Sequence, residues 1–267
     1  MKHKFYIFVF LSLFLVSCSS KKELHETILK IKNNYSGENL SKDAQYFNYD
    51  IDLNILDKTN NKSIVISIHN KIYSIVNFKE NRFYPNYYFQ EVNKYYFDVD
   101  ETILNKEEVN TSFLNNVIKT KSTLYNYQTN ENTINSDTYQ EYASFKHYLC
   151  DGIFLYLSGG DADPYDNYFV YGSINSTLDG NKIYSIYQSF QYRDDDLSII
   201  FNKDVYNLRN SFIEYEFDNN FYITKINETG NLSLQAFDND NKESNYEISY
   251  TQSFSFSEPF EFVEVTL

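Results

Sequence analysis

The chain has 267 residues, and its 37 Asp and Glu outnumber its 23 Lys and Arg, which gives a formal net charge of −14 at pH 7. An acidic surface repels nucleic-acid phosphates and anionic lipid headgroups, so the composition argues against nucleic-acid binding and against membrane docking through a basic patch. The chain also has 27 Tyr and 23 Phe but no Trp, and β-strands favour both of these aromatic types.

The first residues form a short apolar leader. Lys2 and Lys4 are followed by an apolar run over residues 5–16 that only Ser12 interrupts. As a helix this run would be about 18 Å long, too short for a hydrocarbon core of about 30 Å. The pattern is typical of an export signal and not of a transmembrane helix. We therefore predict a signal peptide over residues 1–17.

The leader ends in Leu15-Val16-Ser17-Cys18, which resembles the lipobox of bacterial lipoproteins. In that family the cysteine thiol, here that of Cys18, receives a diacylglyceryl group, and the leader is then removed. Two or more acyl chains hold a protein firmly on a membrane. The resemblance implies a lipid-anchored protein on the extracytoplasmic face of the cell membrane, with residues 18–22 as the lipidated cysteine and a tether. The alternative is a secreted protein with a chance cysteine at its cleavage site.

The second cysteine is Cys150. Lipidation of Cys18 would leave Cys150 without a disulfide partner in the chain, so residues 23–267 must fold on their own hydrophobic core. A chain of this length buries enough surface to do so. We expect Cys150 to pack as a small apolar residue. A catalytic thiol beside His147 is the alternative.

The first part of the body is predicted to contain one helix and a meander of strands. Apolar residues recur at helical spacing from residue 23 to about residue 35. The period then changes to two, which predicts strands at 45–55, 64–68, 72–78, 87–92 and 95–99. Turns or breaks are expected at 57–62, at 69–71 and at 81–85.

Two further helices are predicted in the middle of the chain. Asn105 and Glu108 form a pair that resembles a capping box before an apolar stripe, which predicts a helix over residues 105–120. The polar residues 122–136 are predicted to form a loop. Residues 138–149 fit a strand or a helix, and we favour the helix.

In the last hundred residues, apolar and polar side chains alternate again. This alternation is typical of antiparallel sheets that have one buried and one solvent-exposed face. The predicted strands are 168–174, 182–192, 197–201, 211–217, 221–227, 232–237 and 246–256. Their turns are expected at 179–181, 194–196, 218–220 and 229–231, where Asp, Asn and Gly are frequent.

These elements predict a single β-rich domain over residues 23–267 of the α+β class, mainly β. We expect one curved antiparallel sheet, an open half-barrel, with a few helices packed on its concave face. The order of lipidated cysteine, tether helix, meander, central helices and second meander, followed by Ser257-Glu258-Pro259-Phe260, is similar to the LolA/LppX superfamily of lipoprotein carriers. That resemblance implies a concave face that holds acyl chains, and it transfers no individual binding residue.

Candidate site residues are few. Asp161, Asp163 and Asp166 could offer oxygen ligands to Ca²⁺, but the loop lacks the distal glutamate of an EF-hand, and we favour an acidic turn that binds no metal. The sequence has no Gly-x-Ser-x-Gly, His-Glu-x-x-His or phosphate-loop motif. The histidines outside the leader have no metal-ligand spacing, and they are His25, His69 and His147.

These features favour a non-enzymatic lipoprotein without a cofactor that binds a lipid or another apolar ligand in a carrier-like cavity. Its partners would be the membrane, through the lipid anchor, and that ligand, and no oligomeric state follows from the sequence. One alternative is a surface adhesion or interaction module without a cavity, which predicts an exposed aromatic patch on the convex face. The other is an extracellular hydrolase, which requires polar residues that converge in a cleft.

Overall fold

The computed structural model describes residues 21–31, 33–34, 44–77, 82–140, 172–193, 204–237 and 242–267. Its first six strands are β1 (Gln45–Asp57), β2 (Lys62–Asn77), β3 (Arg82–Phe97), β4 (Ile103–Leu114), β5 (Val117–Asn126) and β6 (Glu131–Gln140). The next six are β7 (Gly172–Asp179), β8 (Lys182–Ser189), β9 (Tyr192–Arg193), β10 (Asp204–Phe217), β11 (Ile223–Phe237) and β12 (Glu243–Phe256).

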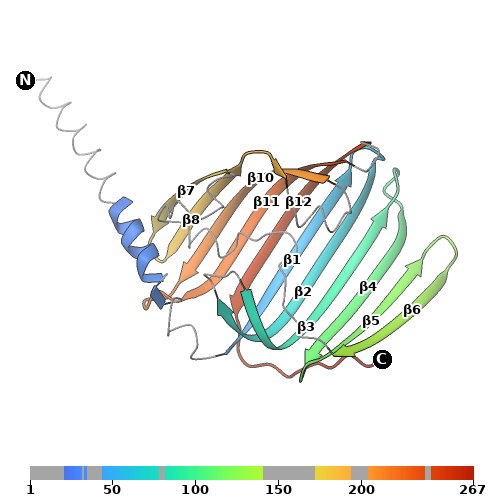
Figure 1. The fold of residues 1–267 in the computed structure, drawn as a ribbon, viewed down its shortest axis with the longest axis horizontal. Coiled ribbons are helices and arrows are strands. Elements are labelled where there is room, and N and C mark those ends of the chain that lie inside the picture. The colour runs from blue at the N-terminus through green and yellow to red at the C-terminus, as the bar shows by residue number, and fades with distance from the viewer. Residues whose placement is uncertain are drawn as a thin grey trace, which may run out of the picture.

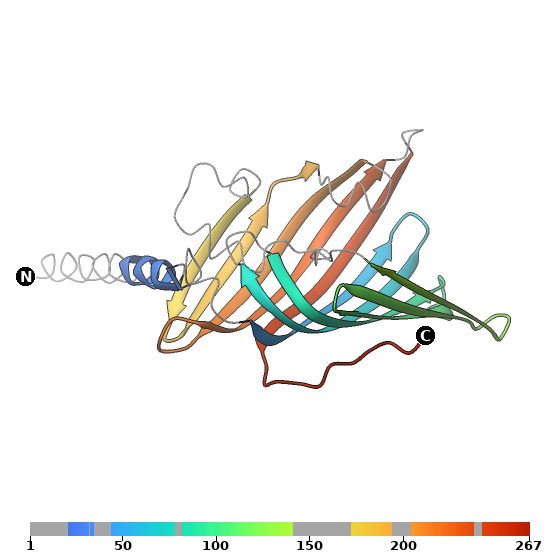
Figure 2. The same cartoon turned by 60° about the horizontal axis from the view of Figure 1, so that its bottom comes forward.

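All these strands belong to one antiparallel sheet with the order β6-β5-β4-β3-β2-β1-β12-β11-β10-β8-β7, and β9 pairs with β10 outside this path (Figure 1). The sheet is curved and open, because β6 and β7 lie at its two ends and do not pair with each other (Figure 2). The mainly β fold with an open, curved antiparallel sheet is therefore confirmed. Two meanders, β1–β6 and β7–β12, meet where β1 pairs with β12.

Side chains alternate between two faces of this sheet. The face that carries the buried side chains of Phe47, Tyr49, Ile51 and Leu53 of β1 is called the inner face. The opposite face is called the outer face. Strand register extends the inner face across the sheet. Tyr49 lies opposite Phe254 of β12, and Phe254 lies opposite Ile226 of β11. Ile226 lies opposite Tyr215 of β10, which lies opposite Ile183 of β8. Most of the hydrophobic core lies on the inner face.

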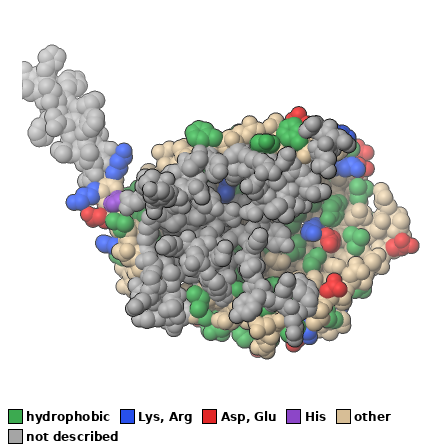
Figure 3. Space-filling model, in the orientation of Figure 1, with side chains coloured by type: hydrophobic (Ala, Val, Ile, Leu, Met, Phe, Trp, Pro, Cys, Tyr) green, Lys and Arg blue, Asp and Glu red, His purple; other side chains and the backbone are tan. Residues whose placement is uncertain are grey.

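One helix is described, over residues 21–31 and 33–34, where the sequence predicts it. Ile28 and Ile31 are buried in the core cluster. Lys30 Nζ lies 4.5 Å from the ring centroid of Phe221, and Asn34 Nδ2 donates to the Asn220 carbonyl oxygen at 2.7 Å. The helix thus packs against the β10–β11 turn, with its charged side chains exposed (Figure 3). Among the described residues, no helix has the length and apolarity needed to cross a membrane.

The helix predicted over residues 105–120 and the loop predicted over 122–136 are both wrong. These residues form β4, β5 and most of β6. Asn115 and Asn116 have φ angles of 52° and 62°, the left-handed pair that a two-residue hairpin turn requires. The turn places Phe113 opposite Ile118. The apolar residues on either side of it are spaced in the sequence like a helix stripe, although they belong to two strands.

Three predicted interruptions are also wrong, because the strands continue through them. Residues 69–71 lie inside β2, residues 229–231 lie inside β11, and residues 82–85 belong to β3. The turns expected near 57–62, 179–181 and 218–220 are confirmed, and Gly180 adopts a φ of 58° in its turn. Of the helix predicted over 138–149, residues 138–140 are in β6, and the others lie outside the described residues. The strand predicted at 197–201 and the turn at 194–196 also lie outside them.

Residues 257–267, which we call the C-terminal strap, run across the outer face of β1 to β5 (Figure 2). Phe260 and Phe262 pack against outer-face tyrosines, and the Tyr87 hydroxyl accepts a hydrogen bond from the Val263 amide at 2.6 Å. Val265 is buried, and its amide donates to Ser112 Oγ at 3.1 Å. The strap therefore covers an aromatic part of the outer face.

We predict that Phe260→Ala lowers the free energy of unfolding by about 1–2 kcal/mol, because it removes the ring contacts with Tyr46 and Tyr87. Urea unfolding followed by far-UV circular dichroism measures the change. Val263→Ala is the matched control, since that side chain is 40% exposed and its backbone makes the bond to Tyr87. The control should change stability by less than about 0.5 kcal/mol, and equal losses for both variants would contradict a packed strap.

Candidate functional site

A buried ion pair joins β10 and β11 on the inner face. Nη2 of Arg209 lies 2.5 Å from Oε1 of Glu228, and the two side chains are 7% and 0% exposed. Removing two charges from water costs several kcal/mol per ion, and the attraction between them offsets this cost only when further hydrogen bonds satisfy both groups. The surroundings of this pair are therefore the first place to look for a site.

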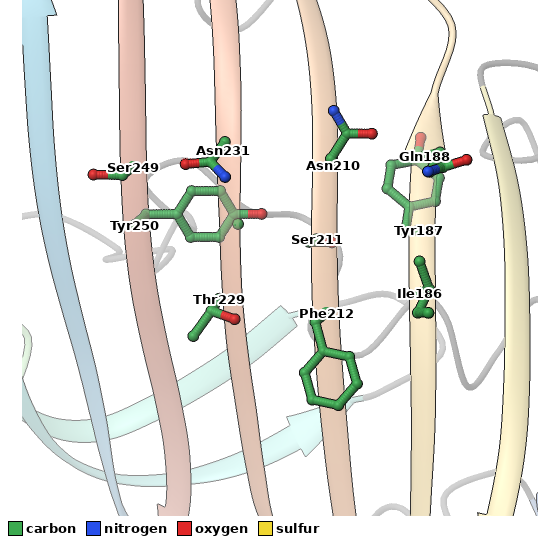
Figure 4. Close-up of a pocket in the computed structure, with 11 residues that line it drawn as sticks. Ile186, Tyr187, Gln188, Asn210, Ser211, Phe212, Thr229, Asn231, Ser249 and Tyr250 are labelled. Atoms are coloured by element: carbon green, nitrogen blue, oxygen red, sulfur yellow. The ribbon is translucent and has the colours of Figure 1, made fainter.

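The Tyr250 ring of β12 extends over β11 (Figure 4), where it lies against Gly230, and its hydroxyl reaches the ion pair. Its hydroxyl donates to Glu228 Oε1 at 2.7 Å and accepts from Arg209 Nε at 2.9 Å. A Cβ atom at residue 230 would lie 2.4 Å from the Tyr250 hydroxyl oxygen, so glycine is required there. The guanidinium carbon of Arg209 also lies 5.6 Å from the Tyr250 ring centroid and 5.8 Å from that of Tyr187, within the range of a cation–π contact.

Further hydrogen bonds extend from Glu228 across the middle of the sheet. Gln252 Nε2 donates to Glu228 Oε2 at 2.6 Å, and the Tyr49 hydroxyl donates to Gln252 Oε1 at 2.8 Å. Asn70 Nδ2 donates to the Tyr49 carbonyl oxygen at 2.7 Å, and Gln90 Nε2 donates to Asn70 Oδ1 at 2.9 Å. We call the whole set the polar belt, which consists of Arg209, Glu228, Tyr250, Gln252, Tyr49, Asn70 and Gln90.

Two inner-face hydroxyls of β10 lie beside the polar belt. Ser211 Oγ and the Tyr215 hydroxyl are buried and have no hydrogen-bond partner within the part of the chain that the structure describes. Burial raises the pKa of Tyr215 well above its ordinary value, and the charge of Glu228 raises it further. Tyr215 is therefore a neutral hydroxyl that can donate a hydrogen bond. A buried polar group without a partner costs about 1–3 kcal/mol, so these two hydroxyls are an unsatisfied polar spot within the described part of the face.

A second candidate site is an open depression on the outer face, with a volume of about 520 Å³ (Figure 4). We call it the outer-face depression. Ile186 of β8 and Phe212 of β10 form its apolar part, and they are 51% and 44% exposed. Its polar part is a row of four side chains from neighbouring strands, Gln188, Asn210, Asn231 and Ser249. Because side chains alternate, Tyr187, Ser211, Gly230 and Tyr250 contribute to its floor from the other face.

The sequence candidates that the structure describes, His25 and His69, are not part of either site. Within the described ranges, no three His, Cys, Asp or Glu side chains gather as metal ligands would. His25 lies on the helix, and His69 of β2 lies 3.1 Å from Asp50 of β1, measured between Nδ1 and Oδ1. The remaining candidates lie outside the described residues, namely Cys18, His147, Cys150, Asp161, Asp163 and Asp166.

Sequence reasoning missed the polar belt, although a signal for it exists. Arg209 is one of only three arginines in the chain. It occupies the same phase of its strand as Ile213 and Tyr215, and Glu228 occupies the same phase as Ile226 and Leu232. A charged residue at an apolar position of an alternating strand indicates that it has a buried partner of opposite charge. When two such residues of opposite charge occur on adjacent strands, we expect them to pair with each other.

Comparisons with known proteins add little to this geometry. No protein-family model matches the sequence, and no curated protein matches it. Among solved structures, the chain is similar to a DUF1329 family protein from Desulfovibrio piger, with 6% identity over 86% of this chain and 91% of that chain. The TM-score is 0.21. A score this low gives no support for a common fold or function.

We predict that Arg209→Met lowers the free energy of unfolding by about 3–5 kcal/mol, because it leaves the Glu228 carboxylate buried without its cation. The double variant Arg209→Met/Glu228→Leu should recover much of this loss, since no uncompensated charge remains. Urea unfolding of the two variants measures both values.

Lys58→Met is the matched control for these two variants. It removes the cation from the ion pair with Glu247, in which both side chains are at least 40% exposed, and should cost less than about 1 kcal/mol. A cost for Arg209→Met as small as that of the control would contradict a buried pair in solution.

Proposed function

We propose that this protein is a lipid-anchored lipoprotein on the extracytoplasmic face of the cell membrane that acts by binding and not by catalysis. We further propose that its ligand is a lipid or another apolar molecule that lies against the inner face of the sheet. The observation that carries this proposal is the pair of buried hydroxyls of Ser211 and Tyr215, which have no hydrogen-bond partner among the described residues and lie beside the polar belt on a face with many apolar side chains.

The proposed anchor is supported by the leader alone. Its basic start, its apolar run and the four residues that end in Cys18 occur in the order and spacing of a lipoprotein signal. Acyl chains on that sulfur would supply the membrane attachment that an acidic chain cannot obtain from anionic headgroups.

The chemistry of the inner face supports a ligand with an apolar body and a polar head. Around the polar belt the face consists of Ile, Leu, Phe and Tyr side chains, which favour contact with hydrocarbon. Tyr215, held neutral by its raised pKa, offers an O–H donor, and Ser211 offers a hydroxyl that can donate or accept. A head group that accepts hydrogen bonds would satisfy both.

The bonding of Glu228 favours binding over catalysis. Oε1 accepts from Arg209 and Tyr250, and Oε2 accepts from Gln252. A carboxylate whose two oxygens are already engaged has little capacity to act as a general base. We therefore interpret the buried acid as part of the scaffold that holds the face, and we propose no reaction.

Cys18→Ser tests the anchor. In cells grown with radioactive palmitate, the unchanged protein should carry label and sediment with membranes, because its sulfur is acylated. The variant should carry no label and retain its leader. Cys150→Ser is the matched control and should be labelled like the unchanged protein. An unlabelled parent protein that fractionates as the Cys18→Ser variant does would overturn this part of the proposal.

Tyr215→Phe tests the inner-face ligand. Leader-free protein expressed in bacteria should yield a lipid or another apolar compound on extraction with organic solvent, and the variant should yield less, because the hydroxyl that contacts the head group is gone. Its stability should not fall, since an unpartnered buried hydroxyl opposes folding by about 1–3 kcal/mol. Tyr222→Phe, at an exposed position, should leave the yield unchanged. Extracts without any apolar compound would count against a carrier.

A further inference from the structure

We infer that the outer-face depression is a separate binding site whose ligand is a neutral polysaccharide. The site lies on the face opposite the proposed lipid site, and it requires neither the anchor nor an inner-face ligand. The inference rests on three properties of its lining residues, namely an exposed apolar platform, a row of uncharged hydrogen-bonding side chains, and a rigid position within the sheet.

The platform consists of Phe212 and Ile186, which lie next to each other in register on β10 and β8. Tyr184 stacks on Phe212, with a centroid distance of 5.9 Å and an interplanar angle of 19°. This contact orients the Phe212 ring while about half of its surface remains exposed. A sugar ring has one face of C–H groups, and an exposed, oriented aromatic ring offers a complementary surface for it.

The polar row lies beside this platform on the same face, two positions along the strands from Ile186 and Phe212 (Figure 4). Strand pairing places Gln188, Asn210 and Asn231 opposite one another, with Ser249 beyond them, so successive members are about 4.8 Å apart. Each amide can donate and accept at once, which suits the adjacent hydroxyl groups of a sugar. A chain of sugar rings can engage one member of the row after another.

The position of the row within the sheet makes it rigid. β10, β11 and β12 each pair with a neighbour on both sides, and β8 lies between β7 and β10. Pairing on both sides fixes the backbone and thus the spacing of the row before a ligand binds, so no backbone ordering adds to the entropic cost of association.

Other ligand chemistries fit this site less well. No strand edge is free at the depression, which excludes binding of an extended peptide by strand addition. No Lys or Arg is among the described residues that line it, so the lining offers no cation to an anionic ligand. A purely apolar partner would leave the whole polar row without hydrogen bonds, which disfavours it.

Affinity electrophoresis of the full chain in detergent tests this inference. Native gels would contain dextran, galactomannan, arabinoxylan or mixed-linkage β-glucan as the neutral probes, and alginate as the anionic one. At least one neutral polysaccharide should retard the protein, and alginate should not. Phe212→Ala and, independently, Asn210→Ala/Asn231→Ala should weaken the retardation by at least about tenfold in dissociation constant.

Tyr127→Ala is the matched control, because Tyr127 is a 50% exposed aromatic residue far along the sheet, after β5. It should bind as the unchanged protein does, and circular dichroism should show all variants folded. Three results would overturn the inference: no retardation by any neutral polysaccharide, retardation by alginate at least as strong as by the neutral probes, or retardation that survives both outer-face variants. None of these results depends on whether Cys18 is acylated or whether the inner face carries a lipid.

Discussion

The pairing of β1 with β12 is the interaction on which the rest of the structure depends. Each half of the sheet is a meander whose strands pair mainly with their neighbours in sequence, and only this pairing joins the halves within the described sheet. It runs without a shift from Phe47 opposite Phe256 to Asp57 opposite Tyr246. The inner face is continuous because this register keeps the apolar phases of both halves on the same side. A slip of one residue would turn one half's apolar side chains outward.

The polar belt crosses this junction and is sensitive to its register. The Tyr49 hydroxyl of β1 bonds to Gln252 of β12, and Gln252 bonds to Glu228 of β11. A displaced register would leave the Glu228 carboxylate buried with fewer hydrogen-bond donors. The resulting loss of folding free energy is larger than the loss from misplaced apolar contacts alone. The belt thus penalises wrong pairings more strongly than it stabilises the correct one. Gly230 contributes to the same selection, because the Tyr250 ring fits over that residue alone in β11.

The sequence predicts those features of the fold that depend on the alternation of apolar and polar residues within a single strand. Alternation identifies β1 and β12 almost to their ends, and it predicts an open antiparallel sheet of the mainly β class. It fails where the meaning of a residue depends on a neighbouring strand. Asn70 suggests a turn in the sequence, but in the sheet its amide bonds to β1 and β3. The hairpin at Asn115-Asn116 was missed because a two-residue turn leaves apolar residues at helix-like spacing.

The candidate sites were harder to predict, for the same physical reason. The ion pair of Arg209 and Glu228 joins two adjacent strands, in which Arg209 lies opposite Leu232 and Glu228 lies opposite Ile213 on the same face. The outer-face depression requires the register of four strands before Gln188, Asn210, Asn231 and Ser249 form a row. Periodicity within one strand carries no information on that register.

The distance in sequence between β1 and β12 also bears on how the protein is made. Tyr49 and Gln252 are 203 positions apart, so β1 is synthesised long before its partner strand β12. Until then β1 and β11 each present an uncovered hydrogen-bonding edge, which is the feature that drives nascent chains to aggregate. Such contacts also form slowly. The sheet can therefore be completed only after the whole of β12 has been synthesised.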